Sequence, residues 1–165
     1  MRILTCLVQV TRMTLLETDS KQEANNKQLV RSFMKAVFND HRPDRAAEFF
    51  APQAKWHGGN FGVVEGAGNI AGLLQAVLAA LPDLTATEQN IVVEGDTVVV
   101  RLIVEGTHKG NLLGLPATNR RVRWDAIDMY KISNGKIVDD WASEDALKIV
   151  ADIGAYIPPW MKSTN

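Results

Sequence analysis

The chain has 165 residues, of which 46% are hydrophobic and 22% are charged, and 18 Lys and Arg against 19 Asp and Glu leave a formal net charge of -1. This length and composition are typical of one globular domain and exclude the disordered and fibrous classes. The near-zero charge creates no overall field that would attract nucleic acid or an anionic membrane. We therefore expect the partner to be a small, weakly charged, hydrophobic molecule.

The single cysteine, Cys6, cannot form an internal disulfide, and no Cys or His spacing is typical of a zinc site. We expect neither a metal nor another cofactor. The longest apolar stretch, residues 70–81, is too short to span a membrane. The apolar run of residues 3–10 lacks the small-residue cleavage pattern of a secretory signal, so we predict a cytoplasmic protein. We assign residues 1–20 to an N-terminal tail, 21–157 to one domain and 158–165 to a C-terminal tail.

The first half of the domain has the periodicity of helices. Ser20 and Glu23 have the spacing of a capping box, which indicates the start of a helix. Apolar residues then recur at three- and four-residue steps, namely Leu29, Val30, Phe33, Met34, Val37 and Phe38. Pro43 suits the first turn of a second, short helix that ends near Phe50. After an extended piece at residues 54–57 and a glycine-rich loop, residues 70–81 form a third helix.

The second half has the period of β-strands. We predict strands at residues 89–94 and 97–107, joined by the Gly95-Asp96 turn, and at 121–132 and 136–142, joined by Asn134-Gly135. A closing helix covers residues 144–153. Helices followed by antiparallel strands define an α+β domain.

Strict alternation along residues 121–132 places a carboxylate on an apolar face. One face carries Val122, Trp124, Ala126, Asp128 and Tyr130, and the other carries Arg121, Arg123, Asp125 and Lys131. Asp128 is costly on a buried face unless it is hydrogen-bonded or functional, because burial disfavours its charged form. Asp128 is therefore a candidate general acid/base, and the alternative is a structural Asp held by a backbone amide or an Arg.

The partner of Asp128 on the next strand depends on the hairpin. A two-residue Asn134-Gly135 turn would place Asp128 opposite Trp141, whereas a three-residue loop with Gly135 in a bulge would place it opposite Asp140, with Ala126 opposite Ala142. In the second register two carboxyl groups share one surface and cannot ionise independently. The simpler alternative leaves Asp140 as a solvated charge at the strand end.

His57 lies where an extended segment opens into the Gly58-Gly59 loop, so it is either a polar group at a pocket rim or merely exposed. The aromatic residues Phe33, Trp56, Trp124 and Tyr130 line a pocket or fill the core. No nucleophile elbow, phosphate loop or dinucleotide fingerprint is present in the sequence.

Two stretches carry a resemblance to a known family. The runs GTHKGNLLGLPATNRRV from Gly106 and DMYKISNGKIVDDW from Asp128 closely resemble the SnoaL-like polyketide cyclase family, and the similarity extends over residues 27–154. The resemblance implies a curved antiparallel sheet wrapped over helices around a cone-shaped pocket, as in a cystatin-like α+β barrel. It also implies a homodimer.

The resemblance also bears on the polar pocket residues. In family members that close a ring by aldol addition, the acid/base Asp lies on the last strand, at the position of Ala142 here. Those cyclases have a His at the position of Asp128, whereas many relatives have Asp there and a His at the position of Asp140. The family alignment favours the register with Asp128 opposite Asp140. His57 coincides with a histidine that is common among the relatives.

We therefore predict a cofactor-free cyclase or isomerase of secondary metabolism that acts on a polyketide-like or terpenoid-like intermediate. Asp128 would transfer the proton, with His57 and Asp140 tuning or relaying it. The predicted substrate contacts are Trp56, Phe33, Val37, Trp124, Ala126, Tyr130, Ala142 and Glu144. The alternatives are a dehydratase or epoxide hydrolase that uses an Asp pair, and a non-catalytic binding module. The expected dimer forms through the outer sheet face, which carries Arg121, Arg123, Asp125 and Trp141.

Overall fold

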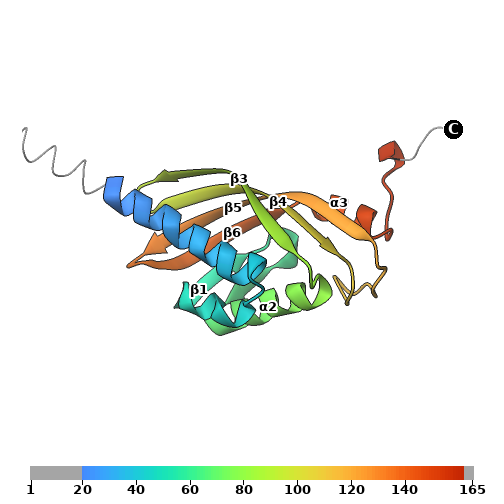
Figure 1. Cartoon of the computed structure of the whole chain (residues 1–165), viewed down its shortest axis with the longest axis horizontal. Helices are drawn as coiled ribbons and strands as arrows, with labels where there is room; N and C mark the ends of the chain where they lie inside the picture. The colour runs from blue at the N-terminus through green and yellow to red at the C-terminus, as the bar shows by residue number, and fades with distance from the viewer. Residues whose placement is uncertain (1–19, 162–165) are drawn as a thin grey trace, which may run out of the picture.

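The structure, a computed structural model, describes residues 20–161, so the predicted tail at residues 1–19 and the last four residues lie outside the described part. A curved sheet of six strands forms one layer, and the N-terminal helix and α2 lie on one side of it (Figure 1). The strand order is β2-β1-β6-β5-β4-β3, and the sheet does not close into a barrel. No helix in the described part of the chain is long and apolar enough to span a bilayer. The predicted α+β class is confirmed.

The N-terminal helix covers residues 20–34 and continues into a π-helical turn, Lys35–Asn39. Its predicted apolar stripe is confirmed, because Val30, Phe33 and Val37 are buried. Ser20 is the first described residue and is helical, so the start of the helix and the predicted capping box lie at the edge of the described residues and stay untested. Glu23 accepts a hydrogen bond from the backbone N–H of Gly95 at 2.8 Å.

The segment that follows contains two short elements that periodicity did not reveal, a 3-10 helix at Gly59–Phe61 and a strand. A 3-10 helix at Pro43–Glu48 follows as predicted from Pro43, and it leads into β1, Phe50–His57, which begins earlier than the predicted extended piece at residues 54–57. The glycine-rich loop contains a short strand, β2, Val63–Glu65, which pairs with β1. Three residues are too few to show an alternation, so β2 was missed. The helix α2 spans Ala67–Ala80.

The four long strands and the closing helix are present as predicted, but β3 begins at Thr85 instead of residue 89, and Glu144 ends β6 instead of starting the helix. They are β3 at Thr85–Glu94, β4 at Thr97–Thr107, β5 at Arg121–Ser133, β6 at Lys136–Glu144 and α3 at Ala146–Asp152. Consecutive long strands pair antiparallel, but β1 pairs with β6 in parallel. The sheet is therefore mixed and not purely antiparallel, because the chain returns from β5 to lie beside its own first strand.

The predicted register of the β5–β6 hairpin is wrong in both of its forms. The turn is a two-residue Asn134-Gly135 turn with φ of 50° and 70°, and Ser133 pairs with Lys136. A bulge then adds one residue to β6 between the pairs Ile132–Ile137 and Lys131–Asp139. Asp128 consequently lies opposite Ala142, and neither Asp140 nor Trp141 is its partner.

The bulge has a physical cause in β6 itself. Ile137 and Asp140 are both buried, although residues three apart point to opposite faces of a regular strand. One extra residue between them restores the common face. The prediction that Asp128 and Asp140 both face the interior is therefore confirmed, while their direct pairing is not.

The motif that carries the family resemblance has a structural role here. Asp83, after α2, accepts hydrogen bonds from the backbone N–H and the hydroxyl of Thr107 at 2.6 and 2.7 Å. His108 is fully buried and its Nδ1 is 3.0 Å from the Thr118 hydroxyl. A Cβ at Gly110 would lie 2.7 Å from the carbonyl oxygen of Ala79. The connection from β4 to β5 is thereby fastened to the end of α2.

Candidate active site

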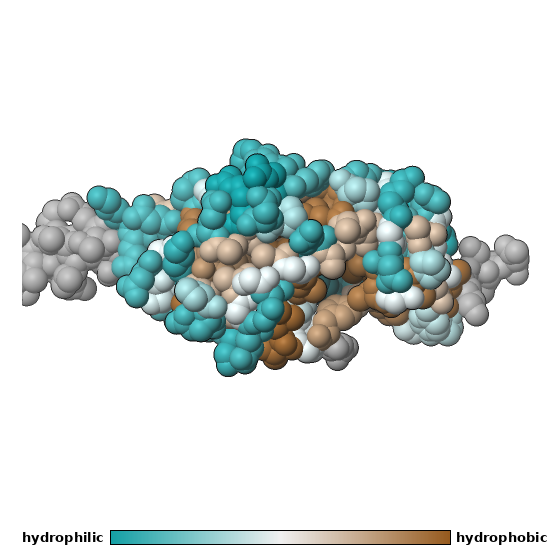
Figure 2. Space-filling model, turned by 90° about the horizontal axis from the view of Figure 1, so that it is seen from below, coloured by the Kyte–Doolittle hydropathy of each residue, from teal (hydrophilic) through white to brown (hydrophobic). Residues whose placement is uncertain are grey.

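A cavity of about 200 Å³ lies between the inner face of the sheet and the helices. Its lining is mostly aliphatic and aromatic. The exposed side chains of Phe61 and Leu113 are part of the lining, so they mark its rim. Seen from below, the molecule shows apolar side chains gathered along the middle of this face, between hydrophilic ones (Figure 2). Such a cavity suits an apolar small molecule held by a few polar groups.

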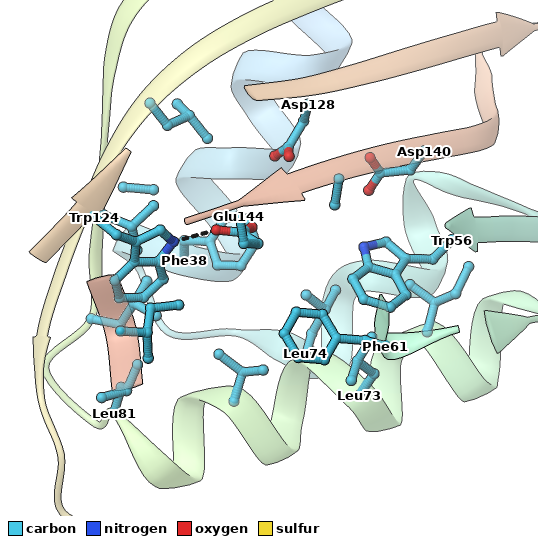
Figure 3. A pocket seen from close by; sticks show the side chains of 18 of the residues that line it. Phe38, Trp56, Phe61, Leu73, Leu74, Leu81, Trp124, Asp128, Asp140 and Glu144 are labelled. Atoms are coloured by element: carbon cyan, nitrogen blue, oxygen red, sulfur yellow. Dashed lines mark hydrogen bonds between the residues drawn. The ribbon is translucent and has the colours of Figure 1, made fainter. Parts of the chain in front are cut away.

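The polar groups of the cavity are concentrated on one wall. Asp128 from β5 and Asp140 and Glu144 from β6 point into the same space (Figure 3). The alternation of each strand explains this, since Asp128 shares its face with Trp124 and Tyr130, and Asp140 shares its face with Ala142 and Glu144. Three carboxyl groups thus face an otherwise apolar cavity.

Asp128 is buried, with 6% of its surface exposed. Its Oδ2 accepts a hydrogen bond from the Tyr130 hydroxyl at 3.1 Å, while its Oδ1 has no partner among the described residues. Burial raises the pKa of Asp128 to about 8, and the charge of Glu144 adds to the rise, against the lowering effect of hydrogen bonds from Tyr130 and the Ser143 backbone. Asp128 therefore changes protonation state close to neutral pH.

Asp140 is as deeply buried as Asp128, with 4% of its surface exposed, but it lacks a hydrogen bond like the one that Tyr130 donates to Asp128. Its Oδ1 has no hydrogen-bond partner within residues 20–161. Burial raises the pKa of Asp140 well above its ordinary value, and the charges of Asp128 and Glu144 raise it further. No hydrogen bond opposes this rise in the pKa of Asp140, which favours its protonated form.

Glu144 is the third carboxyl group of this wall and is held by an aromatic neighbour. The indole N–H of Trp124 donates a hydrogen bond to Glu144 Oε2, drawn as a dashed line in Figure 3. Burial raises the pKa of Glu144, and this hydrogen bond opposes the rise. Glu144 lies opposite Ala126, whereas Asp128 lies opposite Ala142, so Glu144 is displaced along the β5–β6 pair by one inward-facing position from Asp128.

Most of the predicted site residues come together in this cavity. Eight of them line it, namely Phe33, Trp56, Trp124, Asp128, Tyr130, Asp140, Ala142 and Glu144. Val37 and Ala126 do not belong to the lining; both are buried in the core. The ring of Phe33 packs edge-on against Tyr130, with centroids 6.1 Å apart, and so supports the hydroxyl that binds Asp128.

His57 does not lie at the cavity. Its Nε2 is 2.8 Å from Asp139 Oδ1, and its ring stacks on Trp141 with centroids 5.0 Å apart. The register pairs His57 with Trp141, whereas the neighbouring Trp56 pairs with Asp140 on the inner face. Because adjacent residues of a strand point to opposite faces, Trp56 faces inward and His57 outward. A direct proton relay between His57 and the cavity is therefore not supported by its position.

Trp56 reaches the cavity because the following turn leaves room for its ring. A Cβ at Gly58 would lie 2.0 Å from Cη2 of Trp56, so only glycine is compatible with the indole in this position. The sequence identified Gly58 as part of a flexible loop but did not reveal this contact.

Several lining residues were not singled out as site residues from the sequence. They are Phe38, Phe61, Ile70, Leu73, Leu74, Val77, Leu81, Leu84, Ala86, Leu102, Val104, Leu112, Leu113 and Ile149. The four from the middle of α2 have the three- and four-residue spacing that predicted the helix, and this signal identifies a buried face without showing whether it meets core or cavity. Phe61 and the loop leucines had no periodic signal.

Across residues 20–161, no group of three or more His, Cys, Asp or Glu side chains is arranged to hold a metal ion.

The fold and this wall define a class: an α+β cone with ionisable carboxyl groups in an apolar pocket. The model of the SnoaL-like polyketide cyclase family matches residues 28–153, and the chain belongs to that family.

The chain is 45% identical over 49 residues to the aklanonic acid methyl ester cyclase DnrD of Streptomyces peucetius, covering 28% of this chain and 34% of that protein. It thus matches about a third of the curated relative's length.

Two solved structures are similar over nearly their whole length. A protein of Jannaschia sp. CCS1 described as a SnoaL-like polyketide cyclase has a TM-score of 0.76 at 22% identity, over 82% of this chain and 96% of that one. TsrD from Streptomyces laurentii has a TM-score of 0.72 at 28% identity, over 81% and 97%.

Proposed function

We propose that this SnoaL-like protein is a cyclase or isomerase that works by general acid/base catalysis, without a cofactor, on a neutral polyketide-like or terpenoid-like substrate. Asp128 is the base in this proposal. It removes a proton from a carbon next to a carbonyl group, and the resulting enolate carbon attacks a second carbonyl of the same molecule or is protonated elsewhere.

The placement of Asp128 is the observation that carries the proposal. Asp128 lines the cavity; one of its carboxylate oxygens has no hydrogen-bond partner among the described residues, and the other is oriented by Tyr130. A pKa of about 8 makes the ionised form a stronger base than an ordinary carboxylate.

The register adds a second argument for Asp128. The family resemblance puts the acid/base Asp of aldol cyclases at Ala142, which here is the direct cross-strand partner of Asp128. Directly opposite residues have Cβ atoms about 4.5–5.5 Å apart, so a carboxyl group at either position serves nearly the same region of the cavity. The acid/base group is thus proposed to have moved across the strand pair.

A product-mass experiment tests the reaction class. The purified protein is incubated with aklanonic acid methyl ester, the compound in the name of the curated relatives. Intramolecular aldol addition or isomerisation leaves the mass unchanged, whereas a dehydratase removes one water and an epoxide hydrolase adds one. In deuterated buffer, isomerisation places deuterium on the carbon that is reprotonated, whereas aldol addition replaces the broken C–H bond by a C–C bond and leaves deuterium only on the exchangeable hydroxyl. A product that has lost or gained water would contradict the proposal.

The pH dependence of turnover should identify the base. Because Asp128 acts in its ionised form, kcat/KM should rise with pH and reach half its maximum near pH 8, the pKa of Asp128. The measurement is a pH–rate profile between pH 5.5 and about 9.5. Asp139→Asn, which changes the adjacent aspartate on the outer face, should leave that midpoint in place. A rate that falls through this range would assign Asp128 as the acid instead.

We also propose a homodimer through the outer sheet face. Ile127, Met129 and Trp141 are exposed there by 49%, 38% and 38%. The charges around them are paired within the chain, since Arg121 contacts Asp83 and Arg101 contacts Asp125. The surface left for a partner is therefore apolar at its centre, which favours association.

Sedimentation velocity at micromolar concentration should show a dimer of the wild-type chain. Met129→Glu puts a charge at the centre of the interface and should produce a monomer, because burying an unpaired carboxylate is unfavourable. Leu147→Glu, at an exposed apolar position of α3, is the control and should remain dimeric. A monomeric wild-type chain would contradict the proposed surface.

A further inference from the structure

Two polar groups of the cavity wall have no hydrogen-bond partner in the protein. One is Asp140, whose buried Oδ1 is unpaired. The other is the indole N–H of Trp56, a half-buried lining residue whose nitrogen takes part in none of the hydrogen bonds among residues 20–161. A buried carboxyl group is normally hydrogen-bonded, so the unpaired Asp140 beside an unused N–H donor points to a ligand that completes both.

These two groups are neighbours. Trp56 of β1 and Asp140 of β6 are Cα partners in the parallel pair, so their side chains leave the sheet on the same face from strands about 4.8 Å apart. Figure 3 shows the indole nitrogen of Trp56 on the side of the ring that faces the Asp140 carboxyl group. They form no hydrogen bond with each other, and both line the cavity.

We propose that Asp140 and Trp56 form a donor pair that binds one carbonyl oxygen of the substrate, with Asp128 on the same wall as the base. This inference rests on the proposed function and adds a substrate requirement and two assigned roles. The O–H of protonated Asp140 and the N–H of Trp56 donate to the oxygen. The substrate is thus an uncharged molecule with a ketone or ester carbonyl next to an acidic C–H bond.

The donor inventory of the wall leads to this pair. Of the side chains that line the cavity and carry an O–H or N–H, the hydroxyl of Tyr130 already donates to Asp128, and the indole of Trp124 already donates to Glu144. Asp128 is assigned as the base and Glu144 accepts the hydrogen bond of Trp124, so Trp56 and a protonated Asp140 remain as donors. The pKa of Asp140 is raised by burial and by two neighbouring carboxylates, and this supports its donor form at neutral pH.

The two roles complete a balanced step. The C–H bond next to the carbonyl breaks, the proton moves to Asp128, and the electron pair is delocalised onto the carbonyl oxygen as an enolate. The charge that develops on this oxygen strengthens both donated hydrogen bonds, as at an oxyanion hole. When the enolate carbon attacks a second carbonyl, the proton held by Asp128 returns to the new alkoxide.

The lining also determines the charge of the substrate. Among residues 20–161, this lining contains three carboxyl groups and no Lys, Arg or His side chain. An anionic substrate would meet carboxyl groups without a compensating cation, which is unfavourable in an apolar cavity. An ester should therefore bind in preference to the corresponding free acid.

Carbon-13 NMR of a bound ketone tests the donor pair without turnover. The probe is 2-acetylnaphthalene labelled at the carbonyl carbon, whose resonance moves downfield when the oxygen accepts hydrogen bonds. With the wild-type protein we expect a downfield shift on binding. Trp56→Phe and Asp140→Ala should each reduce this shift and weaken binding roughly three- to tenfold, the usual effect of one hydrogen bond between neutral groups. The double variant should lose most of the shift.

Two further variants separate a donor from a base. Asp140→Asn keeps a donor and similar shape, so it should retain much of the shift that Asp140→Ala loses. Asp139→Asn is the matched control, because this neighbouring aspartate lies on the outer face against His57. An unchanged carbonyl shift in Trp56→Phe and Asp140→Ala, or no binding of the ketone, would overturn the donor pair. The proposed function fails on a different observation, namely turnover that does not depend on Asp128.

Discussion

Asp128→Asn should lower kcat by roughly 10²–10⁴-fold, the usual contribution of one general acid/base, while the affinity for a substrate analogue changes only a few-fold. The amide has nearly the same shape, and Tyr130 can still donate to its oxygen, so the cavity keeps its form. It cannot accept a proton from carbon. Steady-state kinetics together with a binding titration separate the two effects, since a binding module would lose little in either.

Two matched variants make this result specific. Asp139→Asn is the same chemical change on the outer face and should leave kcat within about twofold of the wild type, since groups away from the reacting atoms contribute little to the chemical step. Glu144→Gln tests whether Glu144 on β6 is the base instead of Asp128. Its carboxyl group is displaced by one inward-facing position along the β5–β6 pair. If Glu144→Gln rather than Asp128→Asn abolishes turnover, the base has moved along the last strand instead of across it.

The second large effect concerns stability, which should fall as the pH rises from 5 to about 8.5. The folded-state pKa of Asp128 is about 8, against an ordinary value of 3.8, so the folded chain holds a proton that the unfolded chain releases. This contribution is fully present below pH 3.8 and is lost as the pH rises through about 8. Asp140 and Glu144 have raised pKa values as well and act in the same direction.

Thermal unfolding monitored by circular dichroism checks this expectation. Each pKa unit corresponds to about 1.4 kcal/mol, and each kcal/mol shifts the melting temperature of a chain of this size by about 2–4 °C, so we expect a decline of at least about 5 °C between pH 5 and 8.5. The Asp128→Asn, Asp140→Asn double variant should show a much flatter profile. Carboxylates with lowered pKa values, such as Asp83 and Glu88, titrate below this range.

The control variant tests whether the buried carboxyl groups cause the decline in melting temperature. Asp139→Asn should keep the wild-type decline, because it leaves the buried carboxyl groups in place. A melting temperature that is constant or rises between pH 5 and 8.5 would show that the buried carboxyl groups are not protonated in the folded chain.

The local patterns of the sequence determined the elements and the faces of the long strands. The alternation along β5 predicted that Asp128 shares a buried face with Trp124 and Tyr130, and the structure confirms it. The apolar stripe of the N-terminal helix was also predicted correctly. These properties depend on the repeat of 2 or 3.6 residues within one element, so they can be read without knowledge of the neighbours.

The tertiary structure alone decided which residues meet across elements. The bulge in β6 pairs Asp128 with Ala142, because Ile137 and Asp140 must both be buried although their spacing would separate them. The parallel pairing of β1 with β6 turns Trp56 toward Asp140 and His57 toward Trp141. Register and facing between strands depend on contacts between distant segments, and a shift of one residue exchanges the inner and outer faces. A repeat within one strand carries no information about that shift, so only the packed sheet decided which residues lie opposite one another on the acidic wall.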